Sequence, residues 1–425
     1  MEQSILIQGG RILDPANHTD IHGDLLIQEG KIAEIAPKID APGAKVIQAE
    51  GMIVAPGLVD MHVHLRDPGF TQKEDIISGT KAAAAGGVTT VAAMPNTRPV
   101  TDSPEVISYI LEKAKDCPAK VVPIAAITKG QNGEILTDFA ALKAAGAGAL
   151  SDDGKPVATA KLMQDAMIQA YVLKMPVLAH CEDVSLSGKG IIHQGAVSET
   201  LGVEGIPSSA EDVGTAREIA ISAATGRSVH ICHVSTATSV AMIRAAKKDG
   251  VKVTAETGPH YFTLTQDALL GRDADYRMNP PLRTSADKAA IIAGLADGTI
   301  DVIATDHAPH TQEEKADFEK APNGIVGLET SLAASLTALV QTGVLTIHDL
   351  LLKMSYNPSK ILGLDSGTLS IGGDADIAVF APDEVWTVDP QKLNGKASNT
   401  AFKGMNLTGR VKYTFCRGVL VYKDK

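Results

Sequence analysis

The sequence is poor in residues on which several common kinds of protein depend. Aromatic residues make up only 4% of it, and there are four cysteines among 425 residues. Four thiols without a C-x-x-C pair are too few to staple a chain of this size, so a disulfide framework is excluded. The scarcity of aromatic residues argues against a binding module built on aromatic platforms. Cys181 and Cys232 lie in apolar runs, and we expect both to be buried and reduced.

Long apolar runs and basic blocks are also lacking. No run approaches the length of a membrane span, and residues 1–10 lack the regions of a signal peptide, so we expect a cytoplasmic protein. The formal net charge is -11 at pH 7, with acidic and basic residues interspersed. Without a cluster of Lys and Arg to neutralise phosphates, neither nucleic acid nor a membrane is an expected partner.

The middle of the chain alternates apolar runs typical of strands with segments of helical spacing. The predicted strands span 52–61, 88–94, 121–127, 147–151, 176–180, 228–234, 251–256 and 301–305. The predicted helices include 73–85, 104–115, 161–173, 210–225, 236–248 and 285–296. Eight strands, each followed by a crossover, predict the α/β class and a parallel (β/α)8 TIM-like barrel. An open doubly wound sheet is the rival, but residues 146–148 lack the G-x-G-x-x-G motif of a dinucleotide site.

Both ends of the chain have a different pattern, with short β-type runs separated by turn residues. These runs are 5–8, 24–28, 31–35 and 45–48, and then 377–380, 385–388, 411–415 and 419–422. We therefore predict one small β-sandwich domain assembled from 1–51 and 366–425, beside a barrel formed by 52–365. Two unrelated β-extensions are the alternative.

Polar side chains gather where the predicted barrel strands end, which is where barrels of this type carry their active sites. His62 and His64 follow the first strand, and alternation along an extended segment places both on one face. Two imidazoles on one side of a strand end suit a divalent transition metal. An H-x-H pair alone is weak evidence, because a structural pair has the same pattern.

The other strand ends add to this pattern. They carry Asp152 and Asp153, His180, His230 and His233, and Asp306 with His307 and His310. A lone Asp here is more often a helix cap and a lone His more often structural, but polar residues at five strand ends are hard to assign to capping. Six ligands exceed the needs of one tetrahedral zinc and suit two metals that share a hydroxide. Asp306 is then the acid/base that takes a proton from water and delivers it to the leaving nitrogen.

Four segments together resemble the class I dihydroorotases of the amidohydrolase superfamily, and the resemblance covers essentially the whole chain. They are 56–66 (PGLVDMHVHLR), 94–97 (MPNT), 152–154 (DDG) and 306–310 (DHAPH). The resemblance implies reversible ring closure of N-carbamoyl-L-aspartate to L-dihydroorotate, a step of pyrimidine synthesis. It also implies an Asp where many superfamily relatives have a carboxylated lysine.

The resemblance implies a role for each candidate ligand. His62 and His64 bind one metal together with Asp306, while His180 and His233 bind the second. Asp153 bridges or approaches both metals, and zinc is the default for a His-rich site. Three further histidines, His230, His260 and His307, are interpreted as structural.

Substrate contacts follow from the charge of the substrate and from the resemblance. Arg66 offers a planar fork for the carboxylate that is not attacked. The remaining expected contacts are His64, Asn96, Asn279 and His310, with backbone groups of Val326 and Gly327. The polar stretch 308–324 is either a solvated face or a lid that orders over substrate.

Two other functions are weighed against dihydroorotase. A hydantoinase or allantoinase would be expected to use the carboxylated lysine and to lack the set formed by Arg66, Asn96 and His310. A non-catalytic scaffold on the same barrel would have lost metal ligands, whereas this chain keeps every ligand position. A homodimer is expected from the family, and some class I relatives associate with aspartate carbamoyltransferase.

Overall fold

Eight short strands of the middle region run parallel in a computed structural model that describes residues 4–424. They are β6 (Leu58–Val63), β7 (Val88–Ala93), β8 (Lys120–Ala125), β9 (Ala149–Leu150), β10 (Leu178–Ala179), β13 (Val229–Ile231), β14 (Val253–Thr257) and β15 (Val302–Ile303). They form two four-stranded parallel sheets, β6-β7-β8-β9 and β10-β13-β14-β15. Bridges between Leu150 and Val177 and between Val63 and His307 join these sheets at both edges. The predicted α/β class is confirmed, and the parallel strands form a curled sheet.

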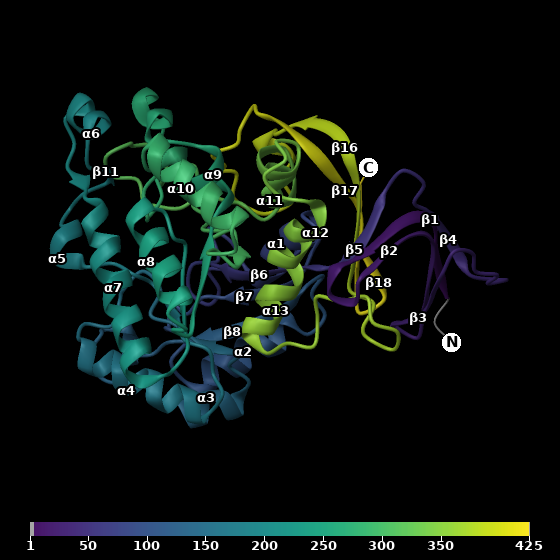
Figure 1. The fold of residues 1–425 in the computed structure, drawn as a ribbon, viewed down its shortest axis with the longest axis horizontal. Helices are drawn as coiled ribbons and strands as arrows, with labels where there is room; N and C mark the ends of the chain where they lie inside the picture. The colour runs from purple at the N-terminus through teal and green to yellow at the C-terminus, as the bar shows by residue number, and fades with distance from the viewer. Residues whose placement is uncertain (1–3, 425) are drawn as a thin grey trace.

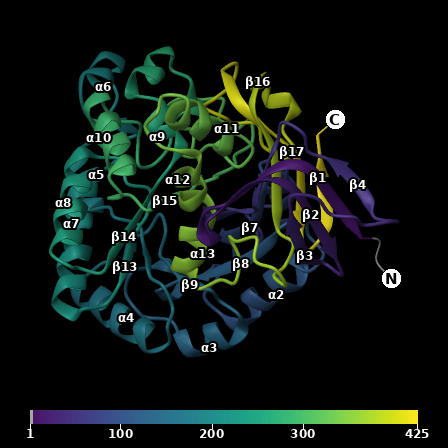
Figure 2. The same ribbon diagram turned by 45° about the vertical axis from the view of Figure 1, so that its right-hand side comes forward.

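Helices surround these strands, as Figure 2 shows. The longer ones are α1 (Ile76–Ala85), α2 (Pro104–Ala114), α3 (Phe139–Ala145), α4 (Ala160–Val172), α7 (Ser208–Thr225), α8 (Ala237–Lys248) and α10 (Ser285–Ala296). The shorter ones are α5 (Val184–Ser187), α6 (Ala196–Leu201), α9 (Pro259–Thr263), α11 (Ser331–Ser335), α12 (Ile347–Leu351) and α13 (Asn357–Leu362). A two-stranded pair, β11 (Ile192–His193) with β12 (Gly205–Ile206), lies between α5 and α7 in the sequence.

Caps explain where the helices begin. Helix α1 begins at Ile76 and not at residue 73 as predicted, because the Asp75 side chain accepts a hydrogen bond from the Ser78 N–H. Thr284 caps α10 in the same way, with Asp287 completing a capping box. The predicted range 285–296 for this helix is confirmed.

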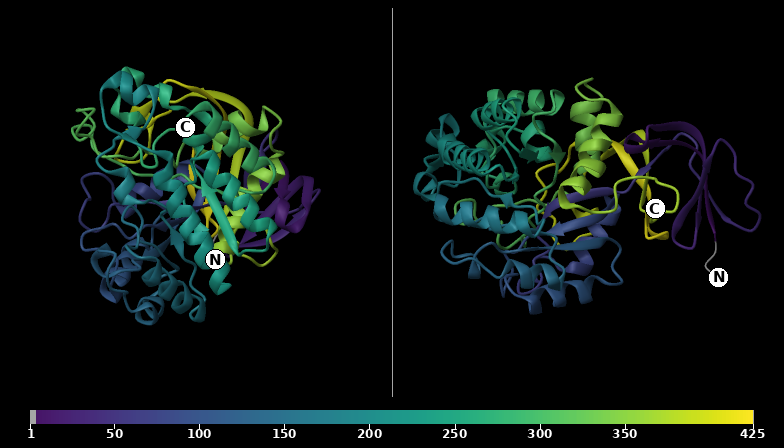
Figure 3. Two further views of the ribbon diagram at one scale, coloured as in Figure 1. Left: turned by 60° about the vertical axis from the view of Figure 1, so that its left-hand side comes forward. Right: turned by 60° about the horizontal axis from the view of Figure 1, so that its bottom comes forward.

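The two ends of the chain meet in one eight-stranded sheet ordered β18-β17-β16-β5-β1-β2-β3, with β4 paired to β1. Its strands are β1 (Ile5–Asp14), β2 (Thr19–Gln28), β3 (Lys31–Ala36), β4 (Lys45–Gln48), β5 (Ile53–Pro56), β16 (Ile377–Thr387), β17 (Asn406–Cys416) and β18 (Val419–Lys423). The N-terminal and C-terminal strands lie side by side at one end of the molecule (Figures 1 and 3). Residues far apart in sequence thus share this sheet through the pairing of β5 with β16.

The predicted first strand, 52–61, is two strands in the structure. Residues Ile53–Pro56 pair with β16, whereas Leu58–Val63 pair with β7. Gly57 lies between them and donates its N–H to the Asp376 carbonyl. A Cβ here would stand 2.2 Å from the Thr89 hydroxyl oxygen, so the crossing requires glycine. The predicted run contains Pro56-Gly57, a dipeptide typical of turns, and the prediction of one continuous strand overlooked this signal.

Side chains fill the interior of the curled sheet. One buried cluster combines residues in or next to the parallel strands with one residue of α13. It comprises Met61, Ala92, Met94, Ile124, Ala149, Leu178, Cys232, Val302, Ala304 and, from α13, Leu362. Because the interior is packed, only the ends of the strands are left to carry a site. Within residues 4–424 we find no helix with the length and apolarity needed to cross a membrane.

Candidate metal and active site

The carboxyl ends of the parallel strands bring the six predicted metal ligands together. His62 belongs to β6 and His64 follows it directly, while the others come after β9, β10, β13 and β15. All six are buried: His62, His64, Asp153, His180, His233 and Asp306. The end of the curled sheet at which these strands terminate therefore collects residues that are up to 244 positions apart in the sequence.

The carboxylate of Asp153 lies in the centre of this cluster. Its Oδ1 is 3.3 Å from Nε2 of His62, and its Oδ2 is 3.5 Å from Nε2 of His64. The same Oδ1 is 3.4 Å from Nδ1 of His180 and 3.5 Å from Nε2 of His233. One carboxylate therefore lies within 3.5 Å of a nitrogen of all four imidazoles.

Asp306 contacts one of these pairs. Its Oδ1 is 2.9 Å from Nε2 of His64 and 3.6 Å from Nε2 of His62. The neighbouring carboxylate Asp152 turns the other way and accepts a hydrogen bond from the Thr128 N–H at 3.1 Å. The opposite orientations of Asp152 and Asp153 agree with an extended segment.

Three of the histidines are oriented by acceptors outside the cluster. The Nδ1–H of His62 donates to Glu256 at 2.6 Å, and the Nδ1–H of His64 donates to Oδ1 of Asn96 at 2.7 Å. The Nε2–H of His180 donates to Glu182 at 2.8 Å. In each neutral ring the other nitrogen then presents a lone pair to the central carboxylates.

Lone pairs that face carboxylate oxygens require positive charge between them. The buried Nε2 of His62 and Oδ1 of Asp153 have no hydrogen-bond partner among the described residues. Ligand atoms of His62, His64 and Asp153 lie within 4.8 Å of one another, as do those of Asp153, His180 and His233. These nitrogen and oxygen donors fit divalent transition metals such as zinc.

The charges within the cluster agree with this fit. Burial alone would lower the pKa of His62, but Asp153, Glu256 and Asp306 outweigh it and raise this pKa well above 6.5. Burial likewise opposes the charged form of His180, yet Asp153 and Glu182 raise its pKa to about 10. The carboxylates of the cluster thus favour positive charge among these imidazoles.

Strained backbone occurs at three of the site residues. Arg66, His233 and Asp306 have φ values of 61°, 35° and 48°, in the left-handed region that residues other than glycine seldom adopt. Such strain persists only where the surrounding structure enforces it, and it concentrates at functional sites. Here it turns side chains at three strand ends toward one cavity.

A cavity of about 180 Å³ opens onto the cluster. Its lining includes all five residues predicted to contact substrate through side chains: His64, Arg66, Asn96, Asn279 and His310. Val326 and Gly327 lie outside it and border a separate space of about 10 Å³. Their N–H groups are already used, by the Asn399 carbonyl and by Nδ1 of His307 respectively.

The chain resembles known proteins over its full length. A family model described as "Dihydro-orotase-like" matches residues 51–239. A dihydroorotase of Geobacter metallireducens is 52% identical over 423 residues, covering 99% of this chain and 100% of that protein. A dihydroorotase of Pelotomaculum thermopropionicum is 50% identical over 422 residues, with 99% of each covered. The chain belongs to the dihydroorotase family.

Solved structures show how far this fold reaches beyond the dihydroorotase family. The L-hydantoinase (dihydropyrimidinase) of Arthrobacter aurescens matches with a TM-score of 0.88 at 25% identity. The match covers 99% of this chain and 96% of that one. The fold is therefore that of the amidohydrolase TIM barrels, and proteins described as hydantoinases share it.

The histidines interpreted as structural differ in their surroundings in this dihydroorotase family member. His307 lies 3.8 Å from Glu74 through Nε2 and accepts from Gly327 through Nδ1, away from the cavity. His260 is buried, and burial lowers its pKa to about 4. His230 contacts Glu256 at 3.2 Å and so reaches the cluster through another residue.

The sequence analysis missed the contacts that Glu256 and Glu182 make with the histidines of the site. For Glu256 there was a signal, because it is a lone carboxylate at the end of an apolar strand.

The two asparagines that line the cavity present opposite ends to it. Asn96 uses its Oδ1 for His64, which leaves its amide N–H groups free for a ligand. Asn279 donates from Nδ2 to Glu182 at 3.1 Å, which leaves its carbonyl oxygen as an acceptor. One side of the cavity thus offers donors and the other an acceptor.

The polar stretch 308–324 is anchored by a buried lysine. The Lys315 Nζ donates to three backbone carbonyls, those of Pro322 at 3.0 Å, Gly324 at 2.9 Å and Arg277 at 3.3 Å. Phe318 and Ala321 are buried as well. The stretch is therefore more than a solvated face, because Lys315 ties it to the segment that carries Asn279.

Burial lowers the pKa of Lys315 to about 7 from 10.5, and the neighbouring Arg277 adds to this against the opposing Asp273, Asp275 and Glu314. Between these two pH values the unfolded chain binds a proton that the folded chain lacks, so stability rises with pH. We expect Lys315→Met to lose this rise, which amounts to at most about 1.4 kcal/mol per pH unit. Urea unfolding of both proteins at pH 7, 8 and 9 measures it. Lys320→Met, at an exposed lysine of the same stretch, is the control, and parallel curves for Lys315→Met and wild type would contradict the assignment.

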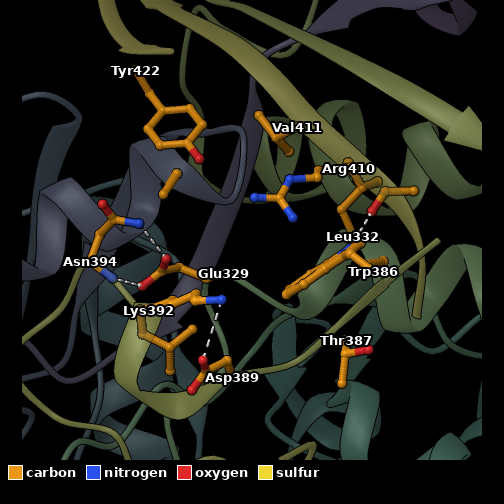
Figure 4. A pocket seen from close by; sticks show the side chains of 14 residues that line it. Glu329, Leu332, Trp386, Thr387, Asp389, Lys392, Asn394, Arg410, Val411 and Tyr422 are labelled. Atoms are coloured by element: carbon orange, nitrogen blue, oxygen red, sulfur yellow. Dashed lines mark hydrogen bonds and ion pairs between the residues drawn. The ribbon is translucent and has the colours of Figure 1, made fainter. Parts of the chain in front are cut away.

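A larger cavity, of about 340 Å³, lies away from the metal ligands between α11 and strands β16 and β17 (Figure 4). Its charged groups are paired with one another or with neighbours: Glu329 accepts from Asn394 at 2.7 Å, Lys392 is 3.5 Å from Asp389, and Arg410 pairs with Asp424. With its charges satisfied internally, we assign no ligand to this cavity.

Proposed function

We propose that this chain is a dihydroorotase that catalyses the reversible cyclisation of N-carbamoyl-L-aspartate to L-dihydroorotate in pyrimidine synthesis. The observation that carries the proposal is the placement of Arg66 in the same cavity as the cluster around Asp153. A cationic fork beside a metal cluster suits a cyclic amide that carries a carboxylate. About 50% identity to dihydroorotases over the full chain supports the same substrate.

In this proposal, His62, His64 and Asp306 would hold one divalent cation and His180 and His233 would hold a second, and Asp153 would contribute to the same site. When bound, such cations polarise the attacked carbonyl and lower the pKa of water, so that a nucleophile exists at neutral pH. We propose zinc as the metal and two ions per chain.

The chain's own residues orient the ring and move the proton. Arg66 binds the substrate carboxylate, and the free carbonyl oxygen of Asn279 accepts from a ring N–H. In the ring-opening direction Asp306 takes a proton from water and passes it to the nitrogen as the C–N bond breaks. The carboxylate of Asp306 suits the first step because neighbouring His62 and His64 hold its pKa below 3.8 in spite of burial. His310 and the backbone at Val326 and Gly327 complete the proposed set of contacts.

The proposal extends to architecture and partners. We propose a β-sandwich domain from 1–51 and 366–425 and a (β/α)8 barrel from 52–365; the pairing of β5 with β16 favours moving the first boundary to Gly57. A cytoplasmic homodimer, and association with aspartate carbamoyltransferase, belong to the same proposal. The shared sheet of the two chain ends supports the composite domain.

The test is a comparison of substrates with zinc supplied. We expect ring opening of L-dihydroorotate, followed in the ultraviolet, with little turnover of hydantoin or allantoin. Removal of metal with a chelator is expected to abolish turnover, and added zinc to restore it. Turnover of hydantoin without turnover of dihydroorotate would instead support the alternative, a hydantoinase on the same barrel. The structural similarity to the L-hydantoinase of Arthrobacter aurescens is the reason to test it.

A further inference from the structure

Glu256 is a buried carboxylate that contacts His62, one of the proposed metal ligands. It is 1% exposed, and it is not part of the cavity lining. Its Oε1 lies 2.6 Å from Nδ1 of His62, on the side of the ring that faces away from Asp153. Because a carboxylate only accepts hydrogen bonds, Nδ1 must carry a proton, and in the neutral ring Nε2 then presents its lone pair to the cluster.

The second oxygen of Glu256 is also held. Its Oε2 lies 3.2 Å from Nε2 of His230, whose Nδ1 lies 2.8 Å from the Thr254 hydroxyl. Glu256 and Thr254 are two positions apart on β14 and so share one face of the strand. The hydrogen bonds therefore run in one direction, from the Thr254 hydroxyl through His230 to Glu256, and a second bond reaches Glu256 from His62.

A separate cation site at this place is the alternative. Ligand atoms of His62, Cys232 and Glu256 lie within 4.8 Å of one another. However, both Glu256 oxygens already accept hydrogen bonds from histidines, and Cys232 packs in the apolar cluster that fills the interior of the sheet. A carboxylate with both oxygens in use, beside a thiol in apolar surroundings, makes a poor ligand set for a separate cation.

We propose that Glu256, held by His230 and Thr254, is a positioning residue that fixes the tautomer and orientation of His62 and so sets the affinity of the cluster for metal. The inference rests on the proposed metal site. Carboxylates that hold the outer N–H of a metal-binding histidine raise its basicity and fix its ring, and their loss weakens metal affinity by about 10–100-fold. His230 thereby has a role beyond packing.

The experiment measures zinc affinity by titration against a competing chelator, without any substrate. We expect Glu256→Gln to weaken zinc binding by about 10–100-fold, because the amide loses the charge and can turn its N–H groups toward His62. Thr254→Val, which removes only the hydroxyl that donates to Nδ1 of His230, is expected to weaken binding by about a few-fold in the same direction. It also serves if Glu256→Gln fails to fold, as judged by circular dichroism of the metal-free protein.

Two controls separate positioning from other causes. Glu329→Gln changes a half-buried glutamate bonded to Asn394 at the cavity of Figure 4, and it should leave zinc affinity unchanged. Cys232→Ser should also leave it unchanged. A drop in Cys232→Ser equal to that in Glu256→Gln would overturn the proposal in favour of a separate cation site. Equal affinities of Glu256→Gln and Glu329→Gln in folded protein would overturn it as well.

A spectroscopic readout distinguishes orientation from stability. With 15N-labelled histidine, the His62 Nδ1–H bonded to a carboxylate is expected to give a downfield proton resonance that is lost in Glu256→Gln and retained in Glu329→Gln. Persistence of this resonance in Glu256→Gln would overturn the proposal. A wild-type protein that binds zinc but fails to turn over dihydroorotate would refute the proposed function and leave the positioning role intact.

Discussion

Asp306→Asn is expected to lower the turnover of L-dihydroorotate by about 10²–10⁴-fold, the contribution typical of a positioned acid/base. The amide keeps nearly the shape of the carboxylate but cannot take the proton from water or return it to nitrogen. Oδ1 of Asp306 lies 2.9 Å from Nε2 of His64 inside a buried cluster, where a base from bulk solvent has little access. Steady-state assays in both directions measure the loss, and both should fall because one group serves the forward and reverse steps.

Metal content decides how this loss is interpreted, since Asp306 is also a proposed ligand. Zinc measured per chain should stay well above zero in Asp306→Asn, because His62, His64 and Asp153 remain. Asp165→Asn, at an exposed carboxylate paired with Lys161 on α4, is the matched control and should retain full turnover. Full turnover in Asp306→Asn with normal zinc would rule out the proton-transfer role.

Arg66→Met is expected to lower kcat/KM for L-dihydroorotate by about 30- to 3000-fold, the equivalent of roughly 2–5 kcal/mol for an unpaired charge in a desolvated pocket. Burial lowers the pKa of Arg66 to about 10, so the guanidinium is still charged at neutral pH. Its contacts within the chain, the Pro309 carbonyl at 3.2 Å and His310 at 3.3 Å, leave part of the fork for a carboxylate.

Dihydrouracil, which is the same ring without the carboxylate, provides the control. The low activity expected on this compound should change little in Arg66→Met, so the preference for dihydroorotate should collapse. Arg66→Lys keeps the charge without the planar fork and is expected to fall between wild type and Arg66→Met. Equal losses on both compounds would show that Arg66 acts by holding Pro309 and His310 in place.

The periodic features of the fold could be predicted from the sequence, and the contacts across it could not. Apolar runs separated by helical segments predicted the parallel α/β order, because each element carries its own period. The break at Gly57 was overlooked although Pro56-Gly57 is a dipeptide typical of turns, and the contacts with Thr89 and Asp376 that require glycine there exist only in the folded chain. The strands Ala149–Leu150 and Val302–Ile303 are also shorter than the predicted strands 147–151 and 301–305.

The candidate site shows the same division. His62, His64 and Arg66 are close in sequence, so their common placement followed from strand alternation and from the resemblance. Glu256 could not be assigned in this way, because its function depends on two partners from other strands. Val326 and Gly327 were expected at the cavity on resemblance alone, and the structure uses their N–H groups elsewhere.

The sheet shared by the two chain ends has a consequence for synthesis on the ribosome. Ile53 of β5 pairs with Phe380 of β16, so one edge of the N-terminal strands has no partner until more than 300 further residues have been made. At about 5–20 residues per second this takes from roughly 15 seconds to a minute. During that time the edge of β5, with apolar Ile53 and Val54, is exposed to pairing with other nascent chains. We therefore expect the nascent chain to need chaperones, or a low local concentration, to avoid aggregation until β16 has been synthesised.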